Sequence, residues 1–177
     1  DDIQTLMNEF FDIKNKIISK HYLESLSVKD KVVSLVLDDV TQYMSDNDQY
    51  SISWFELRTI VSDTLDKFGL KEKASGFIKA LISENLLREA DEKGTEITFA
   101  YQKFYEYLYA KKYVNMEMNV IIRAVEDKKV TLGTLEMIQI LYMQEMREEF
   151  VSKINDRIHN EAVATFMSGL YWRNVNE

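Results

Sequence analysis

Apolar side chains recur every three or four residues along most of the chain, the spacing that places them on one face of a helix. The chain also contains no Pro and only 5 Gly. Because these two residue types interrupt helices, their scarcity favours long ones. The pattern predicts a mainly helical protein, with helices over 2–25, 28–45, 54–68, 72–87, 101–114, 114–128 and 131–146 and a further helical stretch that includes 150–170.

Three short segments interrupt this helical pattern. Residues 50–53 are polar and β-prone. Residues 87–90 and 96–99 flank a turn that contains Gly94, and two β-prone runs around such a turn predict a β-hairpin. The expected order is therefore a small strand, a helix, a short turn, a second helix and a hairpin, which is the order of a winged helix.

The first helix of this unit, over 54–68, has clear start and stop signals. Ser53 and Glu56 have the spacing of a capping box, in which side chains satisfy backbone groups of the first turn. Gly69 stands where a left-handed residue commonly ends a helix. We predict a mainly α fold, namely a winged helix-turn-helix with a small β-hairpin wing, followed by a helical bundle.

The same pattern predicts two domains. Residues 1–112 would form the winged-helix domain together with its N-terminal helices. Residues 113–177 would form a purely helical domain, the start of a bundle or of a solenoid. This second domain offers one function of its own, a helical surface for a protein partner around Met116–Met118 and Met137–Met146.

Charge and cysteine content narrow the classes of protein to which this chain can belong. The chain carries 30 Asp+Glu against 22 Lys+Arg, a net charge of −8. Nucleic-acid binding draws much of its affinity from Lys and Arg, so we do not expect a nucleic acid as the main partner. The absence of Cys excludes a disulfide scaffold, a Cys-based zinc site and a cysteine nucleophile, and it suits a reducing compartment.

The expected location is the cytoplasm. The sequence has no run of about 18 apolar residues, the length that a membrane-spanning helix requires. It opens DDIQTLMNEF, which has neither the basic start nor the apolar run of a signal peptide. We therefore expect no membrane partner.

Motifs for catalysis are missing from the sequence. It contains no GxxxxGK[ST], GxGxxG, HExxH or GxSxG. His21 and His159 are the only histidines, which leaves little for a metal site. Asp38 and Asp39 are adjacent in a predicted helix, so they point about 100° apart and do not form a facing acid pair. We expect this chain to be no enzyme and to hold no metal or cofactor by itself.

The winged-helix order also supports a different function, that of a stand-alone DNA-binding transcriptional regulator. Its second helix would be the recognition helix, and Lys71, Lys73 and Lys79 would contact DNA. The predicted hairpin opposes this function, because its acidic residues would repel phosphate.

The residues after the hairpin form a dense aromatic run, 99–109. Such a run could be a platform on which bases stack, although helical spacing favours packing in a core. Residues 81–88, the turn and residues 97–110 together resemble the end of the winged-helix domain in NACHT-type STAND P-loop NTPases. The family pattern is F-x-H-x-x-F-x-E-Y/F-x-A-A, and the residues at its matching positions are Phe99, Phe104, Glu106, Tyr107 and Ala110.

The resemblance implies a regulatory role. Such proteins include bacterial antiviral sensors, and their winged helix packs on an upstream ATPase core in the ADP state and swings away on activation. This chain would then be a non-catalytic, signal-transducing fragment that couples the nucleotide state of that core to a C-terminal sensor. The implied partners are the upstream ATPase domain of the same chain and, on activation, further copies. ATP or ADP with Mg would belong to the full-length protein.

One departure from the family pattern bears on function. Tyr101 occupies the position of the His that contacts the phosphate of the bound nucleotide in the family. The resemblance therefore implies that Tyr101 faces the nucleotide. A Tyr hydroxyl can donate one hydrogen bond, but it does not become a cation near neutral pH as His does.

Overall fold

The computed structural model describes residues 3–22 and 31–158. The chain divides into two compact units, Asp1–Tyr105 and Glu106–Glu177. The division falls within helix α5 (Gln102–Tyr113), the helix that also contains the predicted domain boundary after residue 112. The described residues are mainly helical and include one small three-stranded antiparallel sheet, which confirms the predicted fold class.

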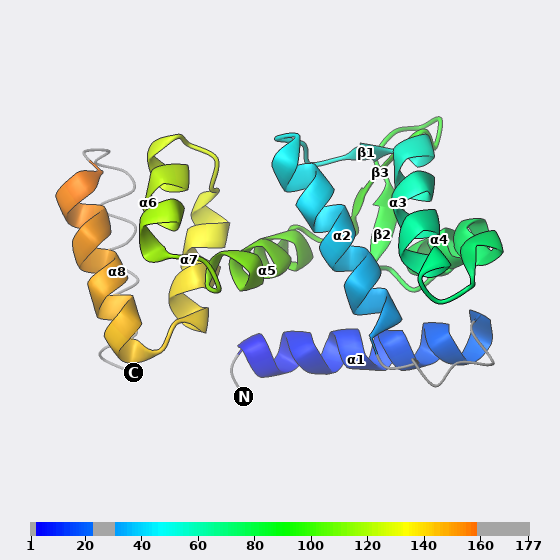
Figure 1. The fold of residues 1–177 in the computed structure, drawn as a ribbon, viewed down its shortest axis with the longest axis horizontal. Helices are drawn as coiled ribbons and strands as arrows, with labels where there is room; N and C mark the ends of the chain where they lie inside the picture. The colour runs from blue at the N-terminus through cyan, green and yellow to red at the C-terminus, as the bar shows by residue number, and fades with distance from the viewer. Residues whose placement is uncertain (1–2, 23–30, 159–177) are drawn as a thin grey trace. The chain divides into compact units, whose positions relative to one another are not determined.

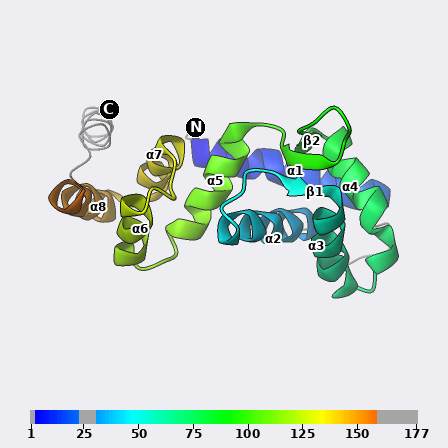
Figure 2. The same cartoon turned by 90° about the horizontal axis from the view of Figure 1, so that it is seen from above.

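The first unit has the element order of a winged helix preceded by one long helix (Figures 1 and 2). Strand β3 is central in the sheet order β1-β3-β2, and Ile97 pairs with Ile52 on one side and with Glu89 on the other. The elements are α1 (Ile3–Tyr22), α2 (Val32–Asp46), β1 (Ile52–Ser53), α3 (Trp54–Asp66), the 3-10 helix η1 (Lys71–Lys73), α4 (Ala74–Ser83), β2 (Leu87–Glu89) and β3 (Glu96–Phe99).

Local signals explain where the helices of this unit begin and end. Ser53 caps α3, since its Oγ accepts a hydrogen bond from the Glu56 amide at 3.2 Å. Gly69 has a φ of +73°, as predicted for the residue that ends this helix. The predicted helix over 72–87 is too long, because α4 ends at Ser83 and Asn85 takes a left-handed φ of +59°. That turn redirects the chain into β2.

Helix α1 packs against α2 and α4 (Figure 1). Its buried apolar side chains are Met7, Phe11 and Ile18. Asn15 lies on the same side, 1% exposed, and its Oδ1 accepts a hydrogen bond of 2.9 Å from the Val33 amide. Because the first amides of a helix have no partner within it, Asn15 caps α2 from a neighbouring helix.

The second unit contains α6 (Met118–Glu126), α7 (Leu132–Leu141) and α8 (Gln144–Arg157) in addition to most of α5. The single helix predicted over 131–146 is wrong, because Tyr142 and Met143 are extended and separate α7 from α8. Arg147 fixes this corner: its Nε donates to the Gln139 carbonyl at 2.7 Å and its guanidinium to the Tyr142 carbonyl at 3.2 Å.

Within residues 3–22 and 31–158, the structure contains no helix with both the length and the apolar character needed to cross a bilayer.

Candidate functional site

The most distinctive side chain at the junction of hairpin and helix is Tyr101. It lies between the end of β3 at Phe99 and the start of α5 at Gln102. Its side chain is 57% exposed, and one edge of the ring meets Phe104 with centroids 5.1 Å apart. An aromatic ring with a hydroxyl at its tip is thus presented to solvent at the first turn of the helix.

An aromatic cluster holds this turn in place. Phe104 is buried and stacks on Phe10 of α1 at 5.0 Å, and it meets the edge of Phe11 at 5.5 Å. The ammonium group of Lys14 lies 5.5 Å from the centre of the Phe10 ring and 3.8 Å from Glu84 at the end of α4. Aromatic pairs contribute about 0.5–1.5 kcal/mol beyond their buried area, so α1 fixes the backbone beneath Tyr101.

A second group of aromatic residues packs beside the same turn and includes residues from β3 and from the segment before β1. Tyr105 meets the edge of the Tyr50 ring at 5.0 Å and lies 6.3 Å from Phe99. The Tyr50 carbonyl accepts a hydrogen bond from the Thr98 hydroxyl at 2.6 Å, which joins this residue to β3. Sequence reasoning missed both groups, because periodicity assigns a residue to a buried face without naming the ring it meets.

The residues that matched the family motif are buried: Phe99, Phe104, Glu106, Tyr107 and Ala110 are exposed by 8% or less. Among the aromatic residues of 99–109, Tyr101 alone is exposed. The run therefore packs inside the protein and does not form a platform for stacked bases. Tyr101 is the ring of the run that a ligand or a partner domain can reach.

Within the second unit, Glu106 lies against the start of α7. A Cβ atom built on Gly133 would lie 2.6 Å from Oε2 of Glu106 and still closer to Oε1. Gly133 is the second residue of α7, which Thr131 caps by accepting a hydrogen bond from the Thr134 amide at 3.1 Å. Because the first turn of a helix attracts negative charge, the position of the Glu106 carboxylate beside the start of α7 is favourable.

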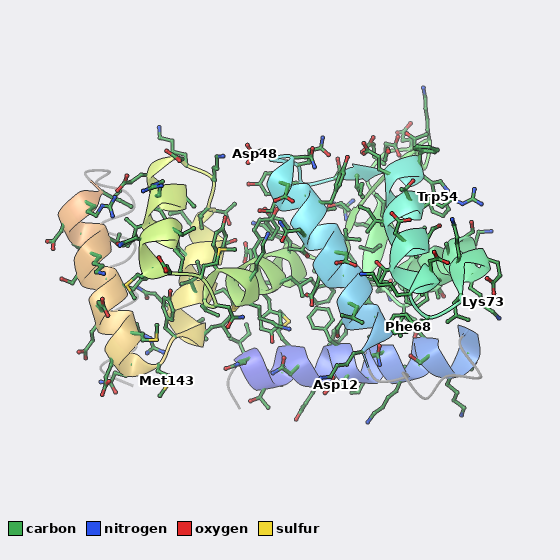
Figure 3. All side chains as sticks on the ribbon, in the orientation of Figure 1. Asp12, Asp48, Trp54, Phe68, Lys73 and Met143 are labelled. Carbon is green, nitrogen blue, oxygen red and sulfur yellow. The ribbon has the colours of Figure 1, made fainter. Side chains whose placement is uncertain are left out.

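The candidate DNA-contacting lysines are exposed, Lys71 and Lys73 in η1 and Lys79 on α4. Figure 3 labels Lys73. Helix α4, however, is held between α3 and α1. The hairpin carries four acidic and two basic residues over 88–96. Hydrogen bonds lower the pKa of Asp91, above all the one from the Thr95 hydroxyl, which favours the charged carboxylate in this hairpin turn.

The other candidates from the sequence are structural or lie outside the site. Asp39 accepts a hydrogen bond of 2.6 Å from the Thr64 hydroxyl and thereby joins α2 to α3. His21 is exposed in the last turn of α1, and His159 lies outside the described residues. In the part of the chain that the structure describes, no three or more His, Cys, Asp or Glu side chains are grouped to hold a metal.

One tyrosine in the second unit has a strongly shifted pKa. Burial raises the pKa of Tyr142 to about 12, with a smaller contribution from the negative charge of Glu149. Its ring packs edge-on against Phe150 at 5.5 Å, and its hydroxyl has no hydrogen-bond partner among the described residues. The helical partner surface predicted around Met137–Met146 is exposed only in part: Met143, next to Tyr142, is 78% exposed, whereas Met137 is buried.

We compared the chain with models of protein families, with curated proteins and with solved structures, and none of the three comparisons found a match.

Proposed function

We propose that this chain is the winged-helix and following helical part of a NACHT-like STAND NTPase, a regulatory part without catalysis of its own. The observation that carries the proposal is Tyr101. It is 57% exposed at the hairpin-to-helix junction, at the position of the family's His, while the five residues that match the motif are buried. This exposure leaves the Tyr101 hydroxyl accessible to a ligand or a partner domain, as the proposed contact requires.

In this proposal the nucleotide and its Mg belong to an upstream ATPase core. The glycines of the chain are dispersed at 69, 76, 94, 133 and 169, so they cannot form the clustered loop that cradles phosphates. The chain would contribute the Tyr101 hydroxyl, which donates one hydrogen bond to a phosphate oxygen of ADP. Loss of that contact would release the winged helix, and the helical unit would pass the movement on to a C-terminal sensor. A cytoplasmic protein of bacterial defence or signalling fits this role.

The proposal is tested on the protein that contains the ATPase core. Tyr101→Phe removes the hydroxyl and keeps the ring, so ADP should dissociate about five- to ten-fold faster, the effect of one hydrogen bond. Tyr101→His should restore slow release. Tyr50→Phe is the matched control, because Tyr50 is 55% exposed and lies outside the motif. Equal ADP release from Tyr101→Phe and from the unmodified protein would contradict the assigned contact.

A second candidate function is duplex DNA binding, which the exposure of Lys71, Lys73 and Lys79 favours. Fluorescence anisotropy with duplex DNA at about 50 mM salt would show micromolar binding that weakens steeply as salt is added. Replacing the three lysines by Ala would abolish it, whereas Lys128→Ala with Lys129→Ala, also exposed, would not. Absence of binding at low salt would eliminate this function.

A further inference from the structure

Helix α1 has a second apolar face in addition to the one that packs on α2 and α4. Leu6 and Ile13 are 53% and 56% exposed, although both are large aliphatic side chains. Partly exposed apolar residues continue the same line, so that the stripe consists of Ile3, Leu6, Phe10, Ile13 and Ile17. Contiguous exposed apolar surface of this kind commonly marks an interaction site.

The spacing of the stripe is informative. Its members follow one another at intervals of three, four, three and four residues. This is the alternation of the a and d positions in a coiled coil, in which the seam of one helix faces the seam of another. The buried residues Phe11 and Ile18 lie outside these positions. Phe10 also stacks on the buried Phe104, so the seam borders the face that builds the core of the first unit and shares this one ring with it.

The charged residues of α1 indicate which molecule docks on the exposed stripe. Glu9 and Lys16 are exposed and occupy equivalent positions beside the seam, one heptad apart. If a second α1 packs antiparallel, with Leu6 facing Ile17 and Phe10 facing Ile13, Glu9 of each copy lies beside Lys16 of the other. Lys20, the next seam position, then faces Ile3 of the other copy and does not meet the other copy's Lys20.

A parallel arrangement fits less well. It would place Lys20 against Lys20 in the seam, and like charges in direct contact are destabilising. It would also pair Glu9 with Lys14, which already lies 3.8 Å from Glu84 and over the Phe10 ring. The antiparallel arrangement leaves Lys14 in these contacts and also opposes the two helix dipoles.

We propose that the exposed stripe of α1 is a self-association surface, on which a second copy of this chain docks through its own α1 in an antiparallel coiled coil. The inference is independent of the proposed nucleotide contact. A seam of about 20 residues is a small interface, so we expect a reversible dimer with a Kd on the order of 10 µM.

Sedimentation equilibrium of the full chain over a range of concentrations tests the proposal. The average mass should rise with concentration and approach twice the monomer mass above about 100 µM, and Leu6→Glu with Ile13→Glu should weaken the dimer at least about ten-fold. Val120→Glu with Leu132→Glu is the matched control, since these residues are 49% and 45% exposed in the second unit. This control should dimerise as the unmodified chain does.

A charge swap tests the antiparallel register without touching the seam. Glu9→Lys alone and Lys16→Glu alone should each weaken the dimer, and the double variant should restore it, because the opposite charges meet again across the interface. Circular dichroism verifies that each variant is folded. A chain that stays monomeric, a dimer insensitive to Leu6→Glu with Ile13→Glu, or a double charge variant that does not recover would each overturn the proposal.

Discussion

At Gly133 the structure predicts that replacement by Ala destabilises the protein, the opposite of the usual effect within a helix. Replacing Gly by Ala within a helix normally stabilises a protein by about 0.5–1 kcal/mol. At Gly133 the added Cβ would instead collide with the Glu106 carboxylate, 2.6 Å from Oε2 and closer to Oε1. Glu106 is only 3% exposed, so its side chain has no open solvent to move into.

The balance of these two effects sets the expected change in the free energy of unfolding. Overpacking of a filled site costs about 1–3 kcal/mol, which exceeds the gain in helix propensity. Gly133→Ala should therefore destabilise the second unit by about 1–2 kcal/mol, which lowers the melting temperature by roughly 2–8 °C for a chain of this length. Thermal unfolding followed by circular dichroism measures this.

Two comparisons isolate the cause. Gly76 lies within α4 with nothing within 4 Å of an added Cβ, so Gly76→Ala should stabilise the chain. In a Glu106→Ala background the collision is absent, so Gly133→Ala should change from destabilising to neutral or stabilising, as a double-mutant cycle would show. If Gly133→Ala in the unmodified chain proves as stabilising as Gly76→Ala, the packing of Glu106 against α7 is refuted.

Three further predictions concern single side chains. Asn15→Leu should destabilise the first unit by about 1–3 kcal/mol in urea unfolding, because it leaves the buried Val33 amide without its acceptor; no loss would contradict the cap. The folded-state pKa of Tyr142 is about 12, above its ordinary value, so its contribution to stability should be constant below about pH 9 and be lost between about pH 10 and 12. Tyr142→Phe should make the alkaline fall shallower in a pH series of melting temperatures, and an unchanged fall would show that Tyr142 does not cause it. Arg147→Ala should cost about 1–3 kcal/mol because two carbonyls at the end of α7 lose a charged donor, whereas an unchanged melting temperature would show that the corner holds without it.

Much of the fold follows from local patterns. The cap formed by Ser53 and the left-handed Gly69 could be read from the sequence because each acts on its own helix end. The end of α4 could not, because Asn85 is a residue for which a left-handed φ is allowed but not required. The break at Tyr142 was missed because its signal comes from Arg147, a side chain of the following helix.

For the candidate site, too, one part could be predicted from the sequence and another could not. The motif placed Tyr101 at the hairpin-to-helix junction, and the structure adds that it is exposed there. The support beneath it was not predictable, because Phe10 and Phe104 are far apart in sequence and meet only through the packing of α1. Periodicity predicted a helix over 2–25 but could not separate the buried residues of α1 from its exposed stripe, since one helix can carry two apolar faces.

We have proposed that this chain is part of a STAND-type NTPase, and the reading frame that precedes Asp1 in the source DNA tests this proposal most directly. The account predicts a GxxxxGK[ST] motif followed by an acidic strand within the same open frame, roughly one ATPase domain upstream. A frame that starts beside Asp1, or an upstream region without a P-loop, would contradict the account and leave duplex DNA binding as the function to examine.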